Sequence, residues 1–436
     1  MSFTKSDFAT GRVDRPTPPS LWHHRDFMKF WTGESLSLLG AQVAALALPL
    51  AAIDAFNASD ELVGLLRFLE LVPYIGLALL FGVWVDRVSR RKAMLWANVV
   101  RMVLVAAVPL LHWAGVLNMP ILLVITCAVG VASVLFDVSW MPFVPTLVTD
   151  SRQRVEANAK MGISQSVSDV AGPGIAGLLV AALTAPVALI VDAFSYVASV
   201  VSLLLIRTPE PRPARGAERH LLRELRDGVE YVFRAPILRW LALVGFCCNF
   251  SMNAVWIMFL LYGRRELDLS SSTIGVILAA ASLGGLIGAM ISTRVINRFP
   301  LGQAYFVAQT GLLLGPVIIV LAAGPEPVVV GLLIVAFFVT DLGLGVANVI
   351  IVTLRQTVTP QSMMSRMTAC FRTLLFGGGA LGGLTAGVLA GSIGSKRALA
   401  VAAIASAAVV IALLRSPVSQ LRELPPAAPQ PQPIPA

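Results

Sequence analysis

Two carboxyl side chains lie deep inside long apolar stretches of this sequence, where an ionised group is costly. Asp169 follows Asn158 by eleven residues in the stretch 158–182. A helix rises about 1.5 Å per residue, so Asp169 would lie ~17 Å along it, near the middle of a membrane. Asp341 occupies a similar depth in the stretch 327–352. Loss of hydration favours the neutral carboxyl, so each could exchange a proton near neutral pH. The competing interpretation is a carboxyl that hydrogen-bonds between helices and does not titrate.

A third acid within an apolar stretch, Glu70, follows Arg67 by three residues. A charge at the centre of a membrane helix costs about 2.5–3.5 kcal/mol on insertion scales, so each charge needs a partner or a role. Residues at this spacing share one face of a helix, and an ion pair would account for both side chains. Glu70 is therefore the third candidate for a coupling proton, after Asp341 and Asp169.

The elements that must position these groups are membrane helices. Apolar residues make up 57% of the chain and charged residues 13%, against about 45–50% and about 25% in soluble domains. The net charge of +9 comes from short basic clusters between apolar stretches. That pattern reports orientation in a bilayer and does not indicate a surface for nucleic acid. The four cysteines lie inside apolar stretches without the spacing of a metal site, so we expect no metal.

Twelve stretches are long enough to cross a bilayer, which takes about 20 apolar residues. They lie near 28–52, 62–84, 93–113, 120–141, 158–182, 186–206, 237–261, 272–293, 303–323, 327–352, 367–391 and 395–414. The sequence therefore predicts an all-α polytopic membrane protein. Basic residues gather in the even-numbered junctions between stretches, which places both termini in the cytoplasm.

The stretches divide into two sets of six, separated by the one sizeable loop. We expect a polar cytoplasmic tail over 1–27, which lacks the features of a cleaved leader, and a six-helix bundle over 28–206. The cytoplasmic linker 207–236 contains an amphipathic helix, since charged and apolar residues alternate there at helical spacing. A second six-helix bundle follows over 237–414, and a proline-rich tail over 415–436.

The two sets also resemble each other. Val148–Leu179 aligns without gaps on Val358–Leu389, a shift of 210 residues that places glycine on glycine. Parallel repeats of this kind build transporters with two related halves. The small residues predict close approach of helix backbones, as in other membrane helices. The residues expected to act as hinge or packing positions are Gly172, Pro173, Gly177, Gly382 and Gly387.

The joint between the second and third stretches reads GVWVDRVSRRK, residues 82–92. Its spacing of glycine, aspartate and arginines resembles the cytoplasmic signature of the major facilitator superfamily. The resemblance implies twelve helices in two pseudo-symmetric bundles, with this joint bracing one half against the other. Asp137, near the end of a neighbouring stretch, is expected to meet Arg90 or Arg91. The residues assigned to this gate are Gly82, Asp86, Arg87, Arg90, Arg91 and Asp137.

Further segments resemble one exporter branch of that superfamily, which includes the enterobactin exporter and macrolide efflux proteins. They are RDFMKFWTGESLSLLGAQVAALALPL from residue 25 onward, PTLV before the fifth stretch, DAFSYVASVVSLLL in the sixth, and LRQTVTP before the eleventh. The Gly172-Pro173 step is similar to a signature of drug–proton antiporters. The resemblance implies secondary active export of a small amphiphilic molecule by alternating access. Such a molecule could be a drug, a siderophore or a secondary metabolite, and its transport would be coupled to a proton gradient. We expect no cofactor and a monomer.

In this superfamily the first, fourth, seventh and tenth helices line a central cavity. A mostly apolar cavity with a few amides would suit a bulky amphiphilic or aromatic molecule. Hydrogen bonding between helices is the competing explanation for each polar residue. The candidates for lining it are Gln42, Thr126, Ser133, Asn249, Asn253, Trp256, Asp341 and Asn348.

Other classes of function fit less well. The sequence contains no Ser/His/Asp set for hydrolysis and no Gly-rich lysine loop for ATP, so we predict no enzyme. A membrane receptor or scaffold of the same fold that does not transport is one alternative. A proton-coupled importer is the other. A receptor would have no need for hinge glycines and intramembrane acids, both of which this chain has.

Overall fold

The computed structural model describes residues 21–85, 87–210, 221–360 and 363–426, and the regular elements within these ranges are all helices. Eleven of the described helices are long and apolar enough to cross a membrane. They are α1 (Arg25–Leu50, continued by a π-helical turn, Ala51–Ala55), α4 (Arg90–Trp113), α5 (Met119–Leu147), α6 (Ser151–Leu183), α7 (Ala185–Leu205), α9 (Pro236–Arg265), α10 (Ser271–Arg298), α11 (Leu301–Leu321), α12 (Glu326–Val358), α13 (Met364–Ile393) and α14 (Ser395–Leu414).

The predicted second stretch is broken where a continuous helix was expected. It consists of α2 (Asp60–Leu71) and α3 (Pro73–Val85). Pro73 has no N–H to continue the helix, and its ring crowds the preceding turn, so the helix is interrupted there. Val72 closes α2 by donating its N–H to the Phe68 carbonyl at 2.8 Å. Each segment alone is too short to span a bilayer, but end to end they cover the predicted range.

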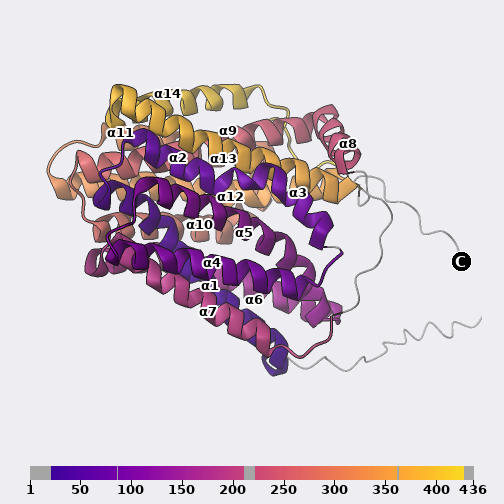
Figure 1. The fold of residues 1–436 in the computed structure, drawn as a ribbon. Coiled ribbons are helices and arrows are strands. Elements are labelled where there is room, and N and C mark those ends of the chain that lie inside the picture. The colour runs from indigo at the N-terminus through magenta and orange to yellow at the C-terminus, as the bar shows by residue number, and fades with distance from the viewer. Residues whose placement is uncertain (1–20, 86, 211–220, 361–362, 427–436) are drawn as a thin grey trace, which may run out of the picture.

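The helices form one elongated bundle with two sides (Figure 1). Helices α1 to α7, which we call the first half, pack mainly among themselves, through α1 with α6 and α7 and α4 with α5 and α7. Helices α9 to α14, the second half, pack through α9 with α13 and α10 with α12. The halves meet where α2 packs on α13 and α6 packs on α10.

A short helix between the halves, α8 (Leu221–Arg234), lies at one end of the bundle (Figure 1). It is held against the second half by polar contacts. Asp227 accepts a hydrogen bond from Arg366 at 3.2 Å. The Tyr231 hydroxyl donates to the Val358 carbonyl at 3.1 Å. Burial raises the pKa of the Tyr231 phenol, so it remains a neutral donor at physiological pH.

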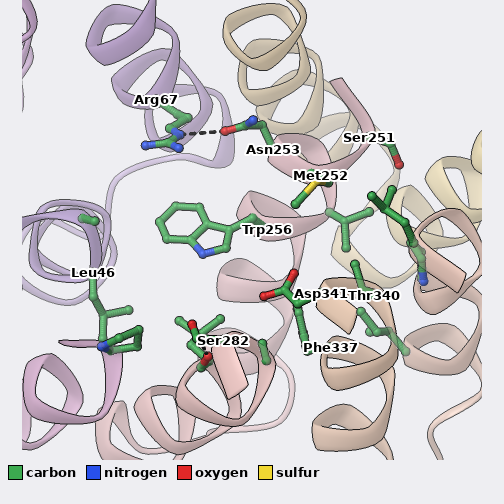
Figure 2. Close-up of a pocket in the computed structure, with 18 of the residues that line it drawn as sticks. Leu46, Arg67, Ser251, Met252, Asn253, Trp256, Ser282, Phe337, Thr340 and Asp341 are labelled. Carbon is green, nitrogen blue, oxygen red and sulfur yellow. Dashed lines mark hydrogen bonds between the residues drawn. The ribbon is translucent and has the colours of Figure 1, made fainter. Parts of the chain in front are cut away.

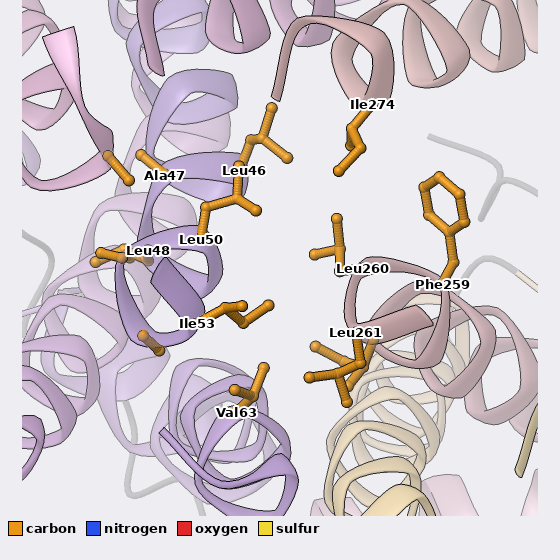
Figure 3. Packing of buried hydrophobic residues seen from close by; sticks show 14 of the residues in the cluster. Leu46, Ala47, Leu48, Leu50, Ile53, Val63, Phe259, Leu260, Leu261 and Ile274 are labelled. Carbon is orange, nitrogen blue, oxygen red and sulfur yellow. The ribbon is translucent and has the colours of Figure 1, made fainter. Parts of the chain in front are cut away.

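The buried apolar residues are arranged unequally along the bundle. Following the orientation predicted from the basic residues, we call the end that carries residues 51–60 and 261–271 the outer end, and the opposite end the inner end. At the outer end a single core joins both halves, with Leu50 and Ile53 facing Leu260 and Leu261 (Figure 3). At the inner end each half has its own core, one over residues 21–206 and one over 232–418. The halves therefore share one core at the outer end and have separate cores at the inner end.

Ion pairs reinforce the outer contact between the halves. Arg264 of α9 reaches Asp54 at 3.0 Å. Its neighbour Arg265 pairs with Asp60 at the start of α2 and also donates to the Ala58 carbonyl. Both arginines belong to the second half and both acids to the first, so each pair stabilises the closed outer end.

Candidate functional site

A cavity of about 320 Å³ lies between the two halves. Helices α1, α2 and α6 contribute one wall, and α9 to α12 contribute the other. Most of the lining is apolar, including Leu46 and Phe337 (Figure 2). The predicted cavity residues that line it are Gln42, Asn253, Trp256 and Asp341.

Asp341 is the acid that faces this cavity most openly. It lies on α12 and is half-buried, and its carboxyl points toward the Trp256 ring (Figure 2). Its carboxyl makes no hydrogen bond to another described residue, and the adjacent Thr340 hydroxyl donates to the Ala336 carbonyl instead. The negative charge that acts on Asp341 is that of Asp169 across the cavity. A carboxyl in this position is free to bind a proton or a cationic group.

Asp169 lies in a different environment on α6. Its Oδ1 atom accepts hydrogen bonds from the side-chain amides of Gln42 and Gln165, both at 2.8 Å. Gln42 comes from α1, so one of these bonds joins two helices. This arrangement matches the alternative interpretation of a carboxyl held by hydrogen bonds between helices.

Arg67 places a positive charge at the opposite side of the cavity. Its Nη1 atom pairs with Glu70 at 2.7 Å, as the spacing predicted. Its Nε atom donates to Asn253 Oδ1 at 3.0 Å, and its guanidinium lies over the Trp256 ring at 5.3 Å. Asn253 and Trp256 belong to α9 of the second half. Arg67 therefore joins the two halves at the cavity, a contact that helical spacing alone does not indicate.

The remaining predicted cavity residues do not line this cavity. Ser133 and Thr126 line a separate cavity within the first half, because α5 turns this face toward α1 and α7. Asn249 donates to the Gly245 carbonyl of its own helix at 3.1 Å. Asn348 is exposed on α12, below the cavity. Phe337 and Arg67 were missed, because an apolar residue or an ion pair within one helix carries no signal for a cavity.

The gate residues are only partly brought together. Asp86 lies outside the described residues, Gly82 borders open space and Arg87 is exposed. Arg90 donates to the Pro142 carbonyl at 3.1 Å, which joins the start of α4 to the end of α5. Arg91 donates to the Leu203 carbonyl at 2.8 Å and to the Leu204 carbonyl at 2.9 Å, at the end of α7. These arginines therefore hold together helices of the first half.

The predicted contact of Asp137 with Arg90 or Arg91 is wrong. Asp137 faces α3, where the Tyr74 hydroxyl donates to its Oδ2 atom at 2.8 Å. The positive charges that act on it are those of Arg101 and Arg372. The Tyr74 ring stacks on Phe376 of α13, with ring centroids 4.1 Å apart. Asp137 thus contributes to a contact between the halves through Tyr74.

An acid of the linker, Glu210, holds the start of α4. Its carboxylate accepts hydrogen bonds from the Ser89 hydroxyl at 2.5 Å and the Arg90 N–H at 2.7 Å. A carboxylate at a helix N-terminus satisfies free N–H groups and interacts favourably with the helix dipole. This contact could not be predicted from the sequence, since Glu210 lies in a proline-rich loop far along the chain.

The glycines of α6 and α13 fall into two groups. A Cβ on Gly177 would meet the Ser271 carbonyl oxygen at 2.5 Å, and one on Gly387 would meet the Asp60 carbonyl oxygen at the same distance. Their partners, Gly275 of α10 and Gly64 of α2, lie in the opposite half. These two contacts are close enough that they require glycine.

Gly172 and Gly382 approach helices of their own half. A Cβ on Gly172 would meet Gln42 of α1, and one on Gly382 would clash with the backbone at Phe250 of α9. Both contacts lie within one half, because the glycines recur at a spacing that places them on different faces of the same helix. Pro173 lines the central cavity, and its carbonyl oxygen faces Gly275 of α10.

The sequence pattern of the Major Facilitator Superfamily matches residues 30–383 and, in a second overlapping match, residues 265–436. The chain belongs to the major facilitator superfamily. The resemblance seen in the loop 82–92 is therefore confirmed, and the protein is a multi-pass integral membrane protein of the cell membrane. Its homologues and its fold are those of transporters.

Efflux proteins are among its relatives. The multidrug efflux pump Tap of Mycolicibacterium fortuitum is 26% identical over 341 residues, which cover 74% of this chain and 79% of Tap. Macrolide efflux protein A of Streptococcus pyogenes is 21% identical over 270 residues, covering 61% and 65% of the two chains. The solved structure of a D323A mutant of the nucleoside transporter NupG has the same fold. It has a TM-score of 0.76 at 11% identity and covers 90% of this chain and 99% of that one.

Proposed function

We propose that this protein exports a small amphiphilic molecule in exchange for protons, by alternating access to the central cavity. The observation that carries the proposal is the Asp341 carboxyl, which faces a cavity between the two halves without a hydrogen-bond partner among the described residues. Such a carboxyl can bind a proton in one access state and release it when a substrate occupies the cavity. The efflux function of the relatives supports the direction of transport.

The lining of the cavity supports an amphiphilic substrate. Trp256 and Phe337 offer aromatic surfaces, while Asp341 and Arg67 offer one charge of each sign. A mostly apolar site with a few fixed polar groups selects for shape and a polar handle rather than for one chemical identity. Drugs, siderophores and secondary metabolites with aromatic bodies have this character.

The unequal packing of the two ends supports alternating access. A shared core and two cross-half ion pairs close the outer end, while the inner cores are separate. A cleft of about 580 Å³ lies at the inner end between α3, α5 and α13. This arrangement would admit a substrate from the inner side, and the reverse arrangement would release it on the outer side.

Inverted membrane vesicles with an acidic interior test the proposal. Ethidium, a macrolide and a catecholate siderophore serve as the substrate panel, and Glu326→Gln, an exposed acid-to-amide change, serves as the matched control. We expect at least one compound to accumulate inside wild-type and control vesicles, and accumulation to collapse when the pH gradient is dissipated. Accumulation that survives loss of the pH gradient would overturn proton coupling. Absence of accumulation for the whole panel in a folded protein would overturn the proposed substrate class.

A further inference from the structure

A second cavity, of about 220 Å³, lies wholly within the first half. Helices α1 to α5 and α7 line it, and it contains an unusual number of ionisable side chains for a membrane interior. The ionisable groups around it are Glu34, Glu70, Tyr74, Arg101, Asp137, Asp192 and Tyr196. None of the three acids Glu34, Asp137 and Asp192 lines the central cavity.

Glu34 and Asp192 are buried without enough hydrogen-bond donors. Glu34 is 6% exposed and Asp192 is 0% exposed. Glu34 Oε2 and Asp192 Oδ2 are buried and have no hydrogen-bond partner among the described residues. The Ser195 hydroxyl donates to the other Asp192 oxygen at 3.2 Å, and the Tyr196 hydroxyl also interacts with this carboxyl. An ionised carboxylate buried in this way costs several kcal/mol, and a neutral carboxyl costs far less.

Arg101 is the one guanidinium lining this cavity in the described part of the chain, and it is 7% exposed. It donates to the Asn98 side chain and lies between the rings of Phe136, at 4.4 Å, and Tyr196, at 4.6 Å. It forms no ion pair with a described acid. Its single charge acts at longer range on several carboxyls, and an arginine stays protonated in proteins.

The other acids of the cavity have their own partners. Glu70 is paired with Arg67 at 2.7 Å. Asp137 accepts the Tyr74 hydroxyl at 2.8 Å and is also subject to the charge of Arg372. With Glu34, Asp137 and Asp192 all ionised, the charge of Arg101 would balance only one of the three carboxylates, and the excess negative charge is unfavourable in a medium of low dielectric constant. The neutral form is therefore favoured at Glu34 and Asp192, the two acids that have a buried carboxyl oxygen without a hydrogen-bond partner among the described residues.

We propose that this cavity is a proton-binding site, separate from the central cavity, in which Glu34 and Asp192 carry the protons. The described acids and other ligand side chains are not gathered closely enough to hold a metal ion, whereas a proton needs a single carboxyl. The inference deepens the proposed function, on which its role in transport rests, because it adds proton carriers beyond Asp341.

Two contacts connect the site to the moving parts. The Arg67–Glu70 pair connects the two cavities, since Glu70 lines the second cavity and Arg67 lines the central one. Asp137 and Tyr74 join it to Phe376 of the second half through a ring stack of 4.1 Å. A change of charge within the first half can therefore act both on the substrate cavity and on the contact between halves.

Infrared spectroscopy of the protein in liposomes measures the protons without any substrate or gradient. A protonated carboxyl has a distinct carbonyl stretch that shifts in heavy water. We expect the wild type at neutral pH to show this band, and Glu34→Gln and Asp192→Asn each to remove part of it. Asp341→Asn and the exposed Glu326→Gln should leave that part unchanged. If a variant does not fold, wild-type protein can be labelled with carbon-13 in its glutamate or aspartate carboxyls. The isotope shift then distinguishes the bands of the two residue types.

The outcomes distinguish this inference from the proposed function. A band that neither variant reduces, or labelled glutamate that contributes no protonated carboxyl, overturns the site at Glu34 and Asp192 even if export is proton-driven. A sodium-dependent shift of carboxylate bands without a protonated carboxyl also overturns it, in favour of a cation site. The expected bands in a protein that exports nothing from the panel would confirm the proton site and contradict the proposed function.

Discussion

Asp341 and Asp169 occupy similar depths but have different partners. Asp169 accepts two amide donors at 2.8 Å, whereas Asp341 faces the cavity without a hydrogen bond to a described residue. The sequence identified both as candidates for one reason, since each is an acid in an apolar stretch. It could not separate them, because helical periodicity does not show which amides of a distant helix face a carboxyl. Because of this difference, Asp341 is the group that we propose for proton coupling.

Asparagine substitution of the two acids therefore should have unequal effects. Asp341→Asn is expected to reduce gradient-driven accumulation to the downhill level while retaining exchange of substrate across the membrane. Asp169→Asn should retain most accumulation, because an amide oxygen can still accept the bonds from Gln42 and Gln165. Accumulation in inverted vesicles measures both. The opposite order of effects would assign coupling to Asp169. If neither variant loses gradient-driven accumulation, Glu70 becomes the next candidate.

At the scale of helices, the sequence predicted most spans because composition alone determines which stretches enter a bilayer. It did not predict the break at Pro73. Hydropathy is averaged over many residues, so a single proline within an apolar stretch hardly changes it. Nor did it predict which glycines meet the opposite half. Gly177 and Gly387 do so and Gly172 does not, a distinction that depends on the rotation of each helix in the bundle.

Bulk at the crossing of α2 and α13 should change the access state. In Gly387→Ala the new Cβ would lie 2.5 Å from the Asp60 carbonyl oxygen. The added strain, about 1–3 kcal/mol, acts on the closed outer end and would shift the equilibrium between states roughly 5- to 150-fold. We expect faster cysteine labelling from the outer side.

Gly331→Ala is the matched control, because no atom lies within 4 Å of a Cβ there, and it should leave labelling unchanged. Gly177→Ala should act in the same direction as Gly387→Ala, since its contact with Gly275 is the counterpart in the other repeat. Unchanged outer labelling in both variants would mean that these glycines only help the helices pack.

The contact of Glu210 with the start of α4 makes a prediction about stability. Glu210→Ala removes the acceptor for the Ser89 hydroxyl and the Arg90 N–H. Loss of a capping interaction costs about 0.5–2 kcal/mol, so thermal unfolding in detergent should occur at a lower temperature. Glu210→Gln should retain part of the stabilisation, because its amide oxygen can still accept these hydrogen bonds. Equal melting temperatures for wild type and Glu210→Ala would show that the linker contributes nothing there.

At the scale of the whole molecule, two halves related by a 210-residue shift meet at one cavity, joined at the outer end and apart at the inner end. The pairs Arg264–Asp54 and Arg265–Asp60 stabilise this state specifically, since each crosses between the halves. The bundle could be predicted from the repeat and the spans. The state could not, because both states share one sequence.

Removal of the outer pairs should favour opening of that end. Asp60→Asn combined with Arg265→Gln is expected to raise outer cysteine labelling and to lower the rate of substrate entry from the inner side. An ion pair that solvent still reaches contributes about 0–1 kcal/mol, so the shift should be roughly fivefold or less. A double-mutant cycle with the single variants isolates the pair, and additive effects would show that the two side chains do not act together.

Exchange of substrate for protons can be measured as proton movement that substrate alone drives. Purified protein is placed in liposomes that contain a pH indicator. A compound that accumulates in the inverted vesicles is then added outside, with no pH gradient imposed. We expect the interior to become alkaline as substrate enters, in wild type and Glu326→Gln but not in Asp341→Asn. Entry of substrate without a pH change, or with acidification of the interior, would contradict it.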